Sequence, residues 1–445
     1  MKIGLIGNMN NNNFSLMRYM RDLGADAHLL LDSTDGKGSS SHFKPECDTW
    51  CIDKWSPYIH QTTIPNAPIA AFDAPVSWLM QLYNRFSIMS GHKTTIPLQS
   101  VSRQVIRCTY KEYDYLVCSG ISPAVLSRID RKPDIFYPYA SGIEFFNSPD
   151  FLKKESQLNF FSKLFFDKTR ERQLNGIRDA HVCLNCDMGE TKKTFDSINV
   201  NFLPLFIPMV YCEQNRVDIS SQIPSSMSSI INQIGSKRIF FHSARVMFEK
   251  PPAIPETDWA FHLSNKNTDV VLKSFAELIK IMPSSQVHLL IIEYGPDVEE
   301  AKSLVSKLGI CEHVTWLPKM QRREVMWFLS KADLVFGEYV RSHGLLWGGT
   351  GWEALASGKA LIQGNFFEKS DFLNTYGCPM PPMLSVRCDE DILRHLIFAV
   401  EYPETLKQIG NDAKVWFDRY QGSGLARKCL DLLTCRSQEN RPGVA

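Results

Sequence analysis

The C-terminal half of the chain alternates short apolar runs with longer segments of helical apolar spacing, and this alternation restricts the fold more than any other feature. The predicted strands are 238–241, 287–292, 313–316, 334–336 and 360–362, and the predicted helices are 269–282, 298–308 and 322–331. Strands that alternate with helices are typical of a parallel sheet covered by helices on both faces. After Asp371 the pattern becomes mostly helical.

The N-terminal half begins in the same way. A strand at Lys2–Ile6, a helix at Phe14–Leu23 and a strand at Ala27–Leu31 predict a βαβ unit. Further strands are predicted at 115–118, 134–138, 180–184 and 202–206. A length of 445 residues suits two domains. We therefore predict an α/β protein with two doubly wound, Rossmann-like domains that face a central cleft, and a helical C-terminus.

The domain boundaries follow from breaks in this pattern. Residues 208–237 contain Pro224 and a serine run, and we predict a linker there. The linker separates an N-terminal domain, 1–207, from a C-terminal domain, 238–435. Residues 436–445 are predicted to be a disordered tail.

Overall composition excludes several classes of protein. The net charge of +1 argues against a nucleic-acid partner, and no apolar run approaches the roughly 20 residues of a membrane helix. The first residues do not form a signal peptide, and the 12 cysteines are scattered, which favours reduced thiols in the cytoplasm. Residues 151–172 alternate phenylalanine with basic residues. We favour core packing there, and peripheral contact with the inner face of a membrane is the alternative.

The strongest candidate site lies in Ala332–Asn365, where glycines precede a short helix that begins near Thr350 or Gly351. Uncovered amides at a helix start bind anions. Glu353 would repel a phosphate, so we expect it to face sugar hydroxyls. A capping box from Thr350 to Glu353 is the alternative. The glycines in question are 344, 348, 349 and 351.

Other candidates lie on loops that follow predicted strands, where α/β sheets bind ligands. The guanidinium of Arg245 can donate two parallel hydrogen bonds, and the ammonium of Lys266 is a compact positive charge. Together they suit a diphosphate. In the N-terminal half, six loop residues are candidates for the acceptor side, and ordinary turn roles are their alternative. They are Gly7, Asn8, Asn10, Gly120, Ser141 and Glu144.

Several segments resemble a known family, and GWEALASGKALI is the most similar of them. The others include HSAR, NKNTDVVLKSFAEL, HLLIIEYGPD and ADLVFGEY. Together, residues 238–364 resemble the C-terminal half of retaining glycosyltransferases of family 4, also called glycosyl transferases group 1, which have the GT-B fold. The resemblance implies Arg245 and Lys266 on the donor phosphates and Glu353 on the donor ribose. It also implies a donor nucleotide beside Gly349 and Gly351, and no required metal. Thr350, Glu293 and Gly295 are further candidates for binding the donor, and we expect no cofactor.

One departure from the family pattern concerns the transferred sugar. The family usually has a second glutamate eight residues before the equivalent of Glu353, where this chain has Leu345. Glu338 and His343 lie in the same loop and are the candidates to replace it. The acidic run Asp389–Asp391 resembles a metal-binding D-x-D, but it precedes a helix, and we favour a capping role.

These expectations describe a glycosyltransferase that moves a sugar from a nucleotide-diphosphate sugar to an acceptor hydroxyl with retention of configuration. The acceptor is expected to be a glycan or a lipid-linked or protein-linked molecule, in glycan, polysaccharide or glycoconjugate biosynthesis. Two alternatives remain: a nucleotide-sugar epimerase of the same architecture, and a catalytically silent protein that binds sugar nucleotides or glycans.

Overall fold

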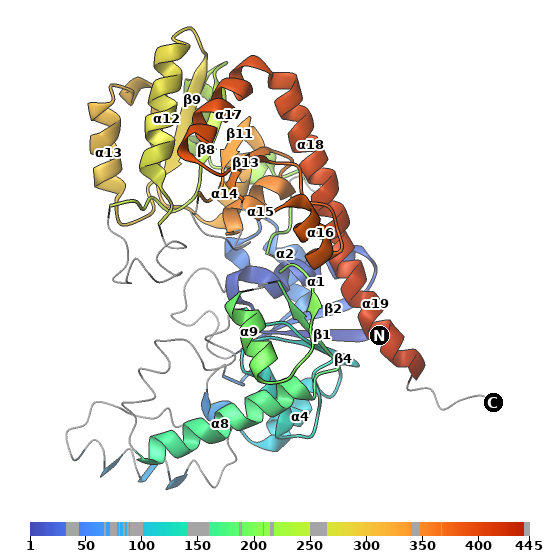
Figure 1. Cartoon of the computed structure of the whole chain (residues 1–445). Helices are drawn as coiled ribbons and strands as arrows, with labels where there is room; N and C mark the ends of the chain where they lie inside the picture. Colours follow the sequence, from blue (N-terminus) through green and yellow to red (C-terminus); the bar gives the residue numbers. More distant parts are fainter. Residues whose placement is uncertain are drawn as a thin grey trace. The chain divides into compact units, whose positions relative to one another are not determined.

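The chain forms two compact units in the computed structural model (Figure 1). The N-terminal unit comprises Met1–Pro45, Cys51–Met209 and Ser423–Ala445, and the C-terminal unit comprises Glu46–Trp50 and Val210–Gly422. The structure describes residues 1–32, 44–65, 68–71, 101–139, 160–186, 189–207, 209–213, 218–249, 265–339, 348–365 and 367–439, with short pieces between 78 and 89.

The N-terminal unit is built on a seven-stranded parallel sheet with the order β3-β2-β1-β4-β5-β6-β7. Strand β1 lies between β2 and β4, so the strand order reverses direction at the β1–β4 pair. The strands are β1 (Lys2–Ile6), β2 (Asp26–Leu31), β3 (Ile59–Gln61), β4 (Tyr115–Cys118), β5 (Ile135–Phe136), β6 (Val182–Asn185) and β7 (Leu203–Pro204).

The helices of this unit pack on the sheet and on one another. Among the residues that the structure describes, the helices longer than five residues are α1 (Asn12–Asp22), α4 (Arg103–Tyr110), α5 (Ser122–Ser127), α8 (Phe160–Arg178), α9 (Glu190–Ser197) and α19 (Ser423–Glu439). In α8, which lies against α5, the buried residues Phe166, Thr169, Gln173 and Ile177 recur at helical spacing. This part of the basic, phenylalanine-rich segment therefore packs inward, and residues 151–159 lie outside the described residues.

The C-terminal unit has a six-stranded parallel sheet with the order β10-β9-β8-β11-β12-β13. The order again reverses beside its first strand, here at the β8–β11 pair. The strands are β8 (Arg238–His242), β9 (Val287–Ile292), β10 (Val314–Leu317), β11 (Leu334–Phe336), β12 (Ala360–Gly364) and β13 (Leu384–Val386). Its helices are α10 (Ser225–Ile234), α12 (Thr268–Ile281), α13 (Val298–Lys307), α14 (Arg322–Lys331), α15 (Gly349–Ala356), α16 (Lys369–Tyr376), α17 (Asp389–Glu401) and α18 (Pro403–Tyr420).

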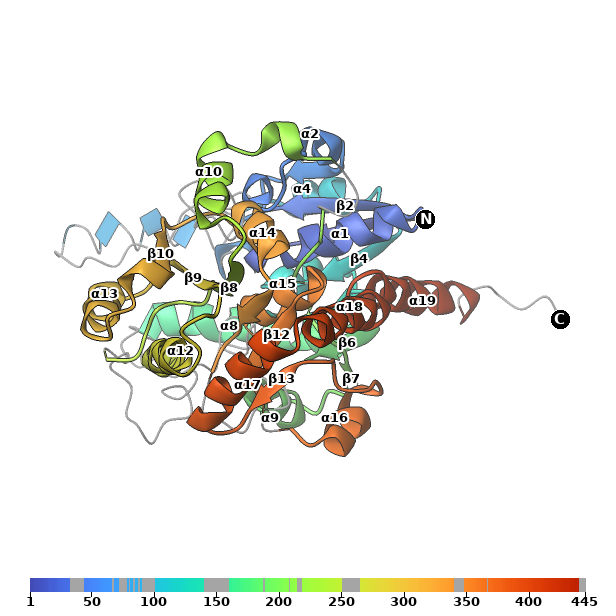
Figure 2. The ribbon, with the colours of Figure 1, turned by 90° about the horizontal axis from the view of Figure 1, so that it is seen from above.

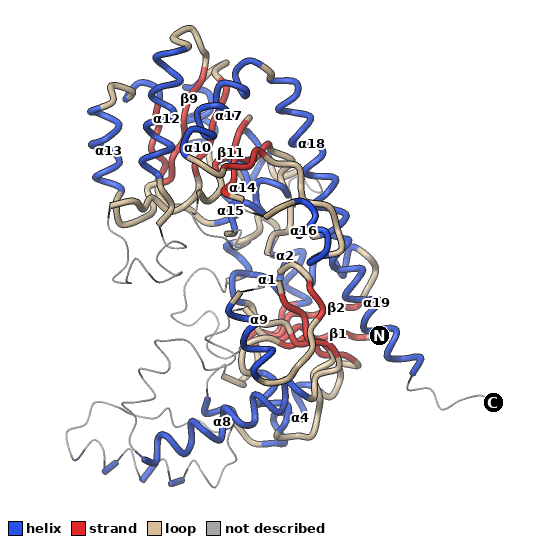
Figure 3. Tube along the Cα trace, viewed as in Figure 1, coloured by secondary structure: helices blue, strands red, loops and turns tan. Residues whose placement is uncertain are grey.

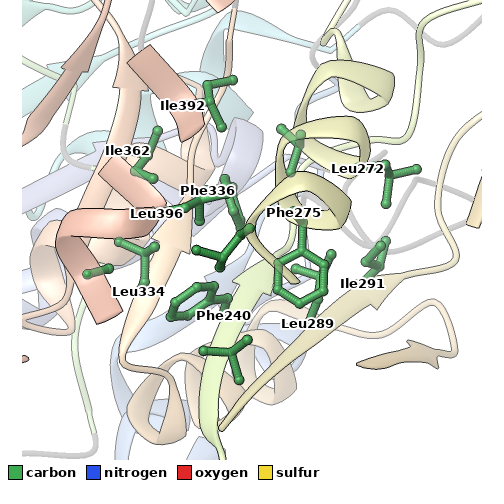
Figure 4. Close-up of a cluster of buried hydrophobic side chains, with 14 of the residues drawn as sticks. Phe240, Leu272, Phe275, Leu289, Ile291, Leu334, Phe336, Ile362, Ile392 and Leu396 are labelled. Atoms are coloured by element: carbon green, nitrogen blue, oxygen red, sulfur yellow. The ribbon is translucent and has the colours of Figure 1, made fainter. Parts of the chain in front are cut away.

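Helices cover both faces of this second sheet, with α12 and α14 on opposite sides of β8 (Figure 2). Successive residues of β8 point to opposite faces, so Phe240 contacts Phe275 of α12 while Phe241 contacts Phe328 of α14. Figure 4 shows the core on the α12 face, where Phe240, Leu289 and Phe336 from the strands meet Phe275. Burial on both faces explains why these strands are continuously apolar.

The alternation of strands and helices agrees with the sequence analysis, and the predicted pair of doubly wound, Rossmann-like units is confirmed (Figure 3). Most predicted ends in the C-terminal half lie within two residues of the observed ones. The segment 208–237, which we predicted as a linker, contains a helix that the sequence analysis did not identify, α10. Its apolar residues Met227, Ile230, Ile231 and Ile234 have helical spacing despite the serines.

No helix in the described ranges has the length and apolarity that a bilayer span requires. The twelve cysteines all lie within the described residues, and none of them forms a disulfide.

Candidate functional site

A buried ion pair lies beside the β8–β11 pair, where the strand order of the C-terminal sheet reverses. Lys266 Nζ lies 2.8 Å from Glu338 Oε2, and the two side chains are only 9% and 17% exposed. Glu338 follows β11, and Lys266 precedes α12, with its backbone N–H donating to Met247 O in the loop after β8. Ligands of doubly wound sheets bind at this edge, beyond the carboxyl ends of the strands.

The backbone of Glu338 is held by Gln363, at the next strand of the sheet. The Gln363 amide donates to Glu338 O at 2.8 Å and accepts from Glu338 N at 3.1 Å. A Cβ at residue 337 would lie 2.0 Å from Gln363 Oε1, so these two hydrogen bonds require a glycine at that position. The position of Glu338 is therefore set by β12 as well as by its own strand.

The carboxylate of Glu338 also lies against the start of α15. A Cβ at Gly348, the residue before the helix, would lie 2.2 Å from Glu338 Oε1. Gly348 therefore allows the carboxylate to approach the helix end closely. The arrangement joins a lysine, a glutamate and the positive end of a helix dipole, all of which can interact with a charged ligand.

The second carboxylate of the site, Glu353, is paired with an arginine that the sequence analysis did not identify. Arg322 Nε donates to Glu353 Oε1 at 2.9 Å, and Arg322 Nη1 donates to Asp48 Oδ1 at 3.1 Å. The Asp48 side chain is 1% exposed. Burial raises the pKa of Glu353, while the charge of Arg322 opposes this shift. The pKa of Arg322 is raised: burial acts against the rise, and the charges of Asp48 and Glu353 outweigh it.

The capping-box alternative for Thr350 and Glu353 was wrong. Helix α15 begins at Gly349 with Gly348 as its N-cap, so Thr350 lies inside the helix, and the Glu353 side chain accepts from Arg322 instead. A charged guanidinium stabilises a buried carboxylate more strongly than a neutral backbone amide does, because it also neutralises the charge.

The capping interpretation of Asp389–Asp391 is confirmed. Asp391 Oδ2 accepts from the backbone N–H groups of Arg387 and Cys388 at the start of α17. Within the described residues, no group of three or more His, Cys, Asp or Glu side chains could hold a metal ion.

The remaining donor-side candidates differ in their surroundings. Arg245 is exposed and, among the described residues, has no ion-pair partner. Glu293 pairs with Lys302 at the surface, at 3.1 Å. Gly295 has φ +147°, and a Cβ there would lie 2.0 Å from Val246 O, so it supports the loop after β8. His343 and Leu345 lie outside the described residues, as do Ser141 and Glu144 on the acceptor side.

The N-terminal loop after β1 is a network of amides and hydroxyls. Asn8 Oδ1 accepts from Phe14 N at 3.0 Å, and Asn8 Nδ2 donates to Asn11 Oδ1 at 2.7 Å. Asn10 and Asn11 both have left-handed backbone angles, which asparagine tolerates. Asn8 is thus buried and holds the turn into α1.

Strand β4 contributes a second part of this network. Asn13 Nδ2 donates to Gly7 O at 2.8 Å and to Ser119 Oγ at 3.1 Å. Gly7 packs against Ser119 and Tyr139, where a Cβ would be 3.0 and 3.1 Å from their oxygens. Gly120 has φ +63° and its carbonyl accepts from Gln173 Nε2.

Sequence reasoning missed several of these residues. Nothing in the local sequence distinguishes Arg322 or Asp48, because their partners are far away along the chain. For Asn13 a signal was present, since it belongs to the asparagine run after β1. The missed residues are Asp48, Arg322 and Gln363 in the C-terminal unit and Asn13, Ser119 and Tyr139 in the N-terminal unit.

Comparison with known proteins gives a family match for part of the chain. Residues 262–416 match the family model described as Glycosyl transferases group 1. A search of curated proteins finds no match. The matched segment contains Lys266, Arg322, Glu338 and Glu353. The chain therefore carries a glycosyltransferase domain, which implies glycosyl transfer from a nucleotide sugar.

Solved structures of similar fold cover nearly the whole chain. The structure of Anabaena HepE in complex with UDP and glucose has 12% identity and a TM-score of 0.54, with 98% of this chain and 100% of that chain covered. A glycosyltransferase from Rickettsia africae has 14% identity and a TM-score of 0.53, with 99% of each chain covered. A UDP-GlcNAc 2-epimerase from Neisseria meningitidis has 11% identity and a TM-score of 0.50, with 98% and 100% covered. At these identities the likeness supports the fold alone, and that fold is GT-B.

Proposed function

We propose that this chain, which carries a glycosyl transferases group 1 domain over residues 262–416, transfers a sugar from a nucleotide-diphosphate sugar to an acceptor hydroxyl with retention of configuration. The observation that supports this most is the buried Lys266–Glu338 pair at the start of α15. A lysine that is nearly buried beside a helix N-terminus is suited to an anionic leaving group.

The leaving group would be the nucleoside diphosphate. As the bond to the sugar breaks, negative charge develops on the diphosphate, and Lys266, Arg245 and the start of α15 near Gly349–Gly351 would stabilise it. Glu353 would accept hydrogen bonds from the donor ribose. We assign Glu293 and Gly295 to the donor side as well, with Gly295 acting through the loop after β8.

Glu338 would replace the glutamate that the family usually has at the position of Leu345. Its carboxylate lies between Lys266 and Gly348, so it is placed to accept hydrogen bonds from hydroxyls of the transferred sugar. His343 remains the second candidate for that role. No covalent nucleophile is assigned.

The N-terminal unit would bind the acceptor through the loops that contain Gly7, Asn8, Asn10, Gly120, Ser141 and Glu144. The described part of this region is uncharged and rich in amides, which suits hydrogen bonding to hydroxyl groups. The acceptor would be a glycan or a lipid-linked or protein-linked molecule, used in glycan, polysaccharide or glycoconjugate biosynthesis.

The direct test uses a panel of UDP-, GDP- and ADP-sugars with a mixture of glycan acceptors. Nucleoside diphosphate release shows turnover, and NMR of the product shows whether the anomeric configuration is retained. Lys266→Ala should abolish most turnover, and Lys273→Ala, which changes an exposed lysine of α12 seven residues further along the chain, is the matched control. Equal turnover in both variants would contradict the phosphate role.

Incubation with the donor alone separates the two alternatives. An epimerase would convert the sugar nucleotide to its epimer without any acceptor, whereas a transferase would at most hydrolyse it slowly. Tight donor binding with no chemistry across the whole panel would instead identify a silent binding protein.

A further inference from the structure

We propose that Arg322 and Asp48 are positioning residues that hold Glu353 ready for the hydroxyl groups of the donor ribose. The proposal rests on the proposed function. It explains how the donor site would distinguish a ribonucleotide from a nucleotide that lacks the ribose hydroxyls. Asp48 comes from Glu46–Trp50, a five-residue segment of the N-terminal half that belongs to the C-terminal unit, and we call it the arm.

The geometry leaves one side of Glu353 open. Arg322 binds Glu353 through Oε1 only, and among the described residues Oε2 has no hydrogen-bond partner. The Glu353 side chain is 11% exposed, so a ligand can reach it. Gly349 lies beside this pair, since a Cβ there would be 3.5 Å from Glu353 Oε1 and 3.8 Å from Arg322 Nη2. A small residue at the helix start therefore keeps the approach to the carboxylate clear.

The arm is fixed to the C-terminal unit by contacts on both sides of Asp48. Glu213 accepts hydrogen bonds from Thr49 Oγ1 at 2.5 Å and from Trp50 N at 2.9 Å. Trp50 Nε1 donates to Arg323 O, and the Arg323 guanidinium lies 4.8 Å from the centre of a Trp50 ring. These contacts hold Asp48 in one place, so that Asp48 in turn holds the guanidinium of Arg322.

A purely structural role explains these charges poorly. Helix α14 already begins with a capping box from Gln321 to Glu324, so Arg322 is not needed to start it. Apolar side chains usually stabilise a buried position as well as an ion pair does. Burial alone would favour the protonated form of Glu353, and the Arg322 charge opposes that. An ionised carboxylate accepts stronger hydrogen bonds from hydroxyls than a neutral acid does.

The test compares the affinity for UDP with that for 2′,3′-dideoxy-UDP by titration calorimetry, and repeats the comparison with the GDP and ADP pairs. Wild type should prefer the ribonucleotide by about tenfold or more, the value expected for hydrogen bonds to a charged group. Arg322→Met and Asp48→Asn should reduce this preference severalfold, and Arg322→Lys should restore part of it. Affinity for the dideoxy nucleotide should change little.

Two control variants give the lower and upper limits of the preference for UDP over 2′,3′-dideoxy-UDP. Glu353→Gln gives the preference that remains when the carboxylate is absent. Glu46→Gln changes an exposed acid of the same arm, whose side chain does not touch Arg322, and should keep the wild-type preference.

Three results would overturn the proposal. One is a wild-type preference in both Arg322→Met and Asp48→Asn, and another is an equal loss of affinity for both nucleotides, which indicates a structural role only. The third is a wild type that binds nucleotides without preference. If Arg322→Met does not fold, Asp48→Asn and Arg322→Lys still decide the matter. A wild type that binds no nucleoside diphosphate would instead contradict the proposed function itself.

Discussion

The two units share a strand order but differ in the chemistry at the place where that order reverses. Beside β8 and β11, the C-terminal unit has buried charges, among them Lys266, Glu338 and Glu353. Beside β1 and β4, the described part of the N-terminal unit has the amides of Asn8 and Asn13 and neutral hydroxyls.

This difference shows that the doubly wound fold supplies a place for a ligand but does not choose the ligand. Buried charges are costly to maintain unless each has a partner. The C-terminal unit meets that requirement with Lys266 against Glu338 and Arg322 against two carboxylates. Beside β1 and β4, the amides of Asn8 and Asn13 instead pair with backbone groups and with neutral side chains, an arrangement that suits an uncharged ligand.

The strongest test of the charged site is Lys266→Ala. We expect turnover to fall about 100- to 1000-fold, the range for removal of one donor that stabilises a developing negative charge. Loss of the lysine also leaves Glu338 buried without its cation. Nucleoside diphosphate release at saturating donor measures the effect, with Lys273→Ala as control. If turnover falls less than about threefold, Lys266 does not stabilise the charge on the leaving group.

The neutral site is tested by Asn13→Ala. This change removes donors to the carbonyls of Ile6 and Gly7, and a buried acceptor left without a partner is costly. We expect the N-terminal unit to lose about 2–3 kcal/mol of unfolding free energy, measured by urea denaturation. Affinity for UDP should stay unchanged. The exposed Asn201→Ala is the control, and a variant as stable as wild type would show that the network is not structural.

The ends of the central strands predict a difference in acid sensitivity. Strand β1 ends in Ile6, whereas β8 ends in His242, whose burial lowers its pKa to about 4. In the unfolded chain His242 binds a proton near pH 6.5. The contribution of neutral His242 to the free energy of unfolding is therefore fully present above pH 6.5 and declines as the pH falls toward 4. Between pH 7 and pH 5 this contribution decreases by about 2 kcal/mol. His242→Phe should lose less stability than wild type over this range in urea denaturation. Parallel losses in the two proteins would show that His242 is not responsible.

The smallest expected effect is that of Glu338→Gln. The amide keeps the shape and can still accept a hydrogen bond, but it loses the charge that pairs with Lys266. We expect kcat to fall about tenfold, equivalent to about 1.4 kcal/mol, with a smaller change in KM for the donor. Glu299→Gln, an exposed acid on α13, is the control. If Glu338→Gln keeps the wild-type kcat, Glu338 does not bind the transferred sugar, and His343 becomes the candidate for that role.

Much of the fold was predictable because its signals are local. Continuous apolar strands and amphipathic helices follow from side-chain periodicity, and these gave the ends of β11 and α14 correctly. The serine-rich helix α10 was missed because composition was given more weight than spacing. Candidate positions on the loops after strands were also predictable, because a parallel sheet places those loops at one edge.

The partners of the charged groups were decided by the tertiary structure. Local sequence offered only a capping box as an intramolecular partner for Glu353, as the alternative to sugar hydroxyls. In the folded chain Glu353 pairs with Arg322, 31 residues away, and Asp48 binds the same guanidinium from 274 residues away. A buried charge takes whichever partner packing brings within reach, and no local pattern records that choice. The sequence by itself determined the two parallel sheets and the loops that carry the candidate site residues. Only the folded chain determined that the arm and α14 together hold Glu353.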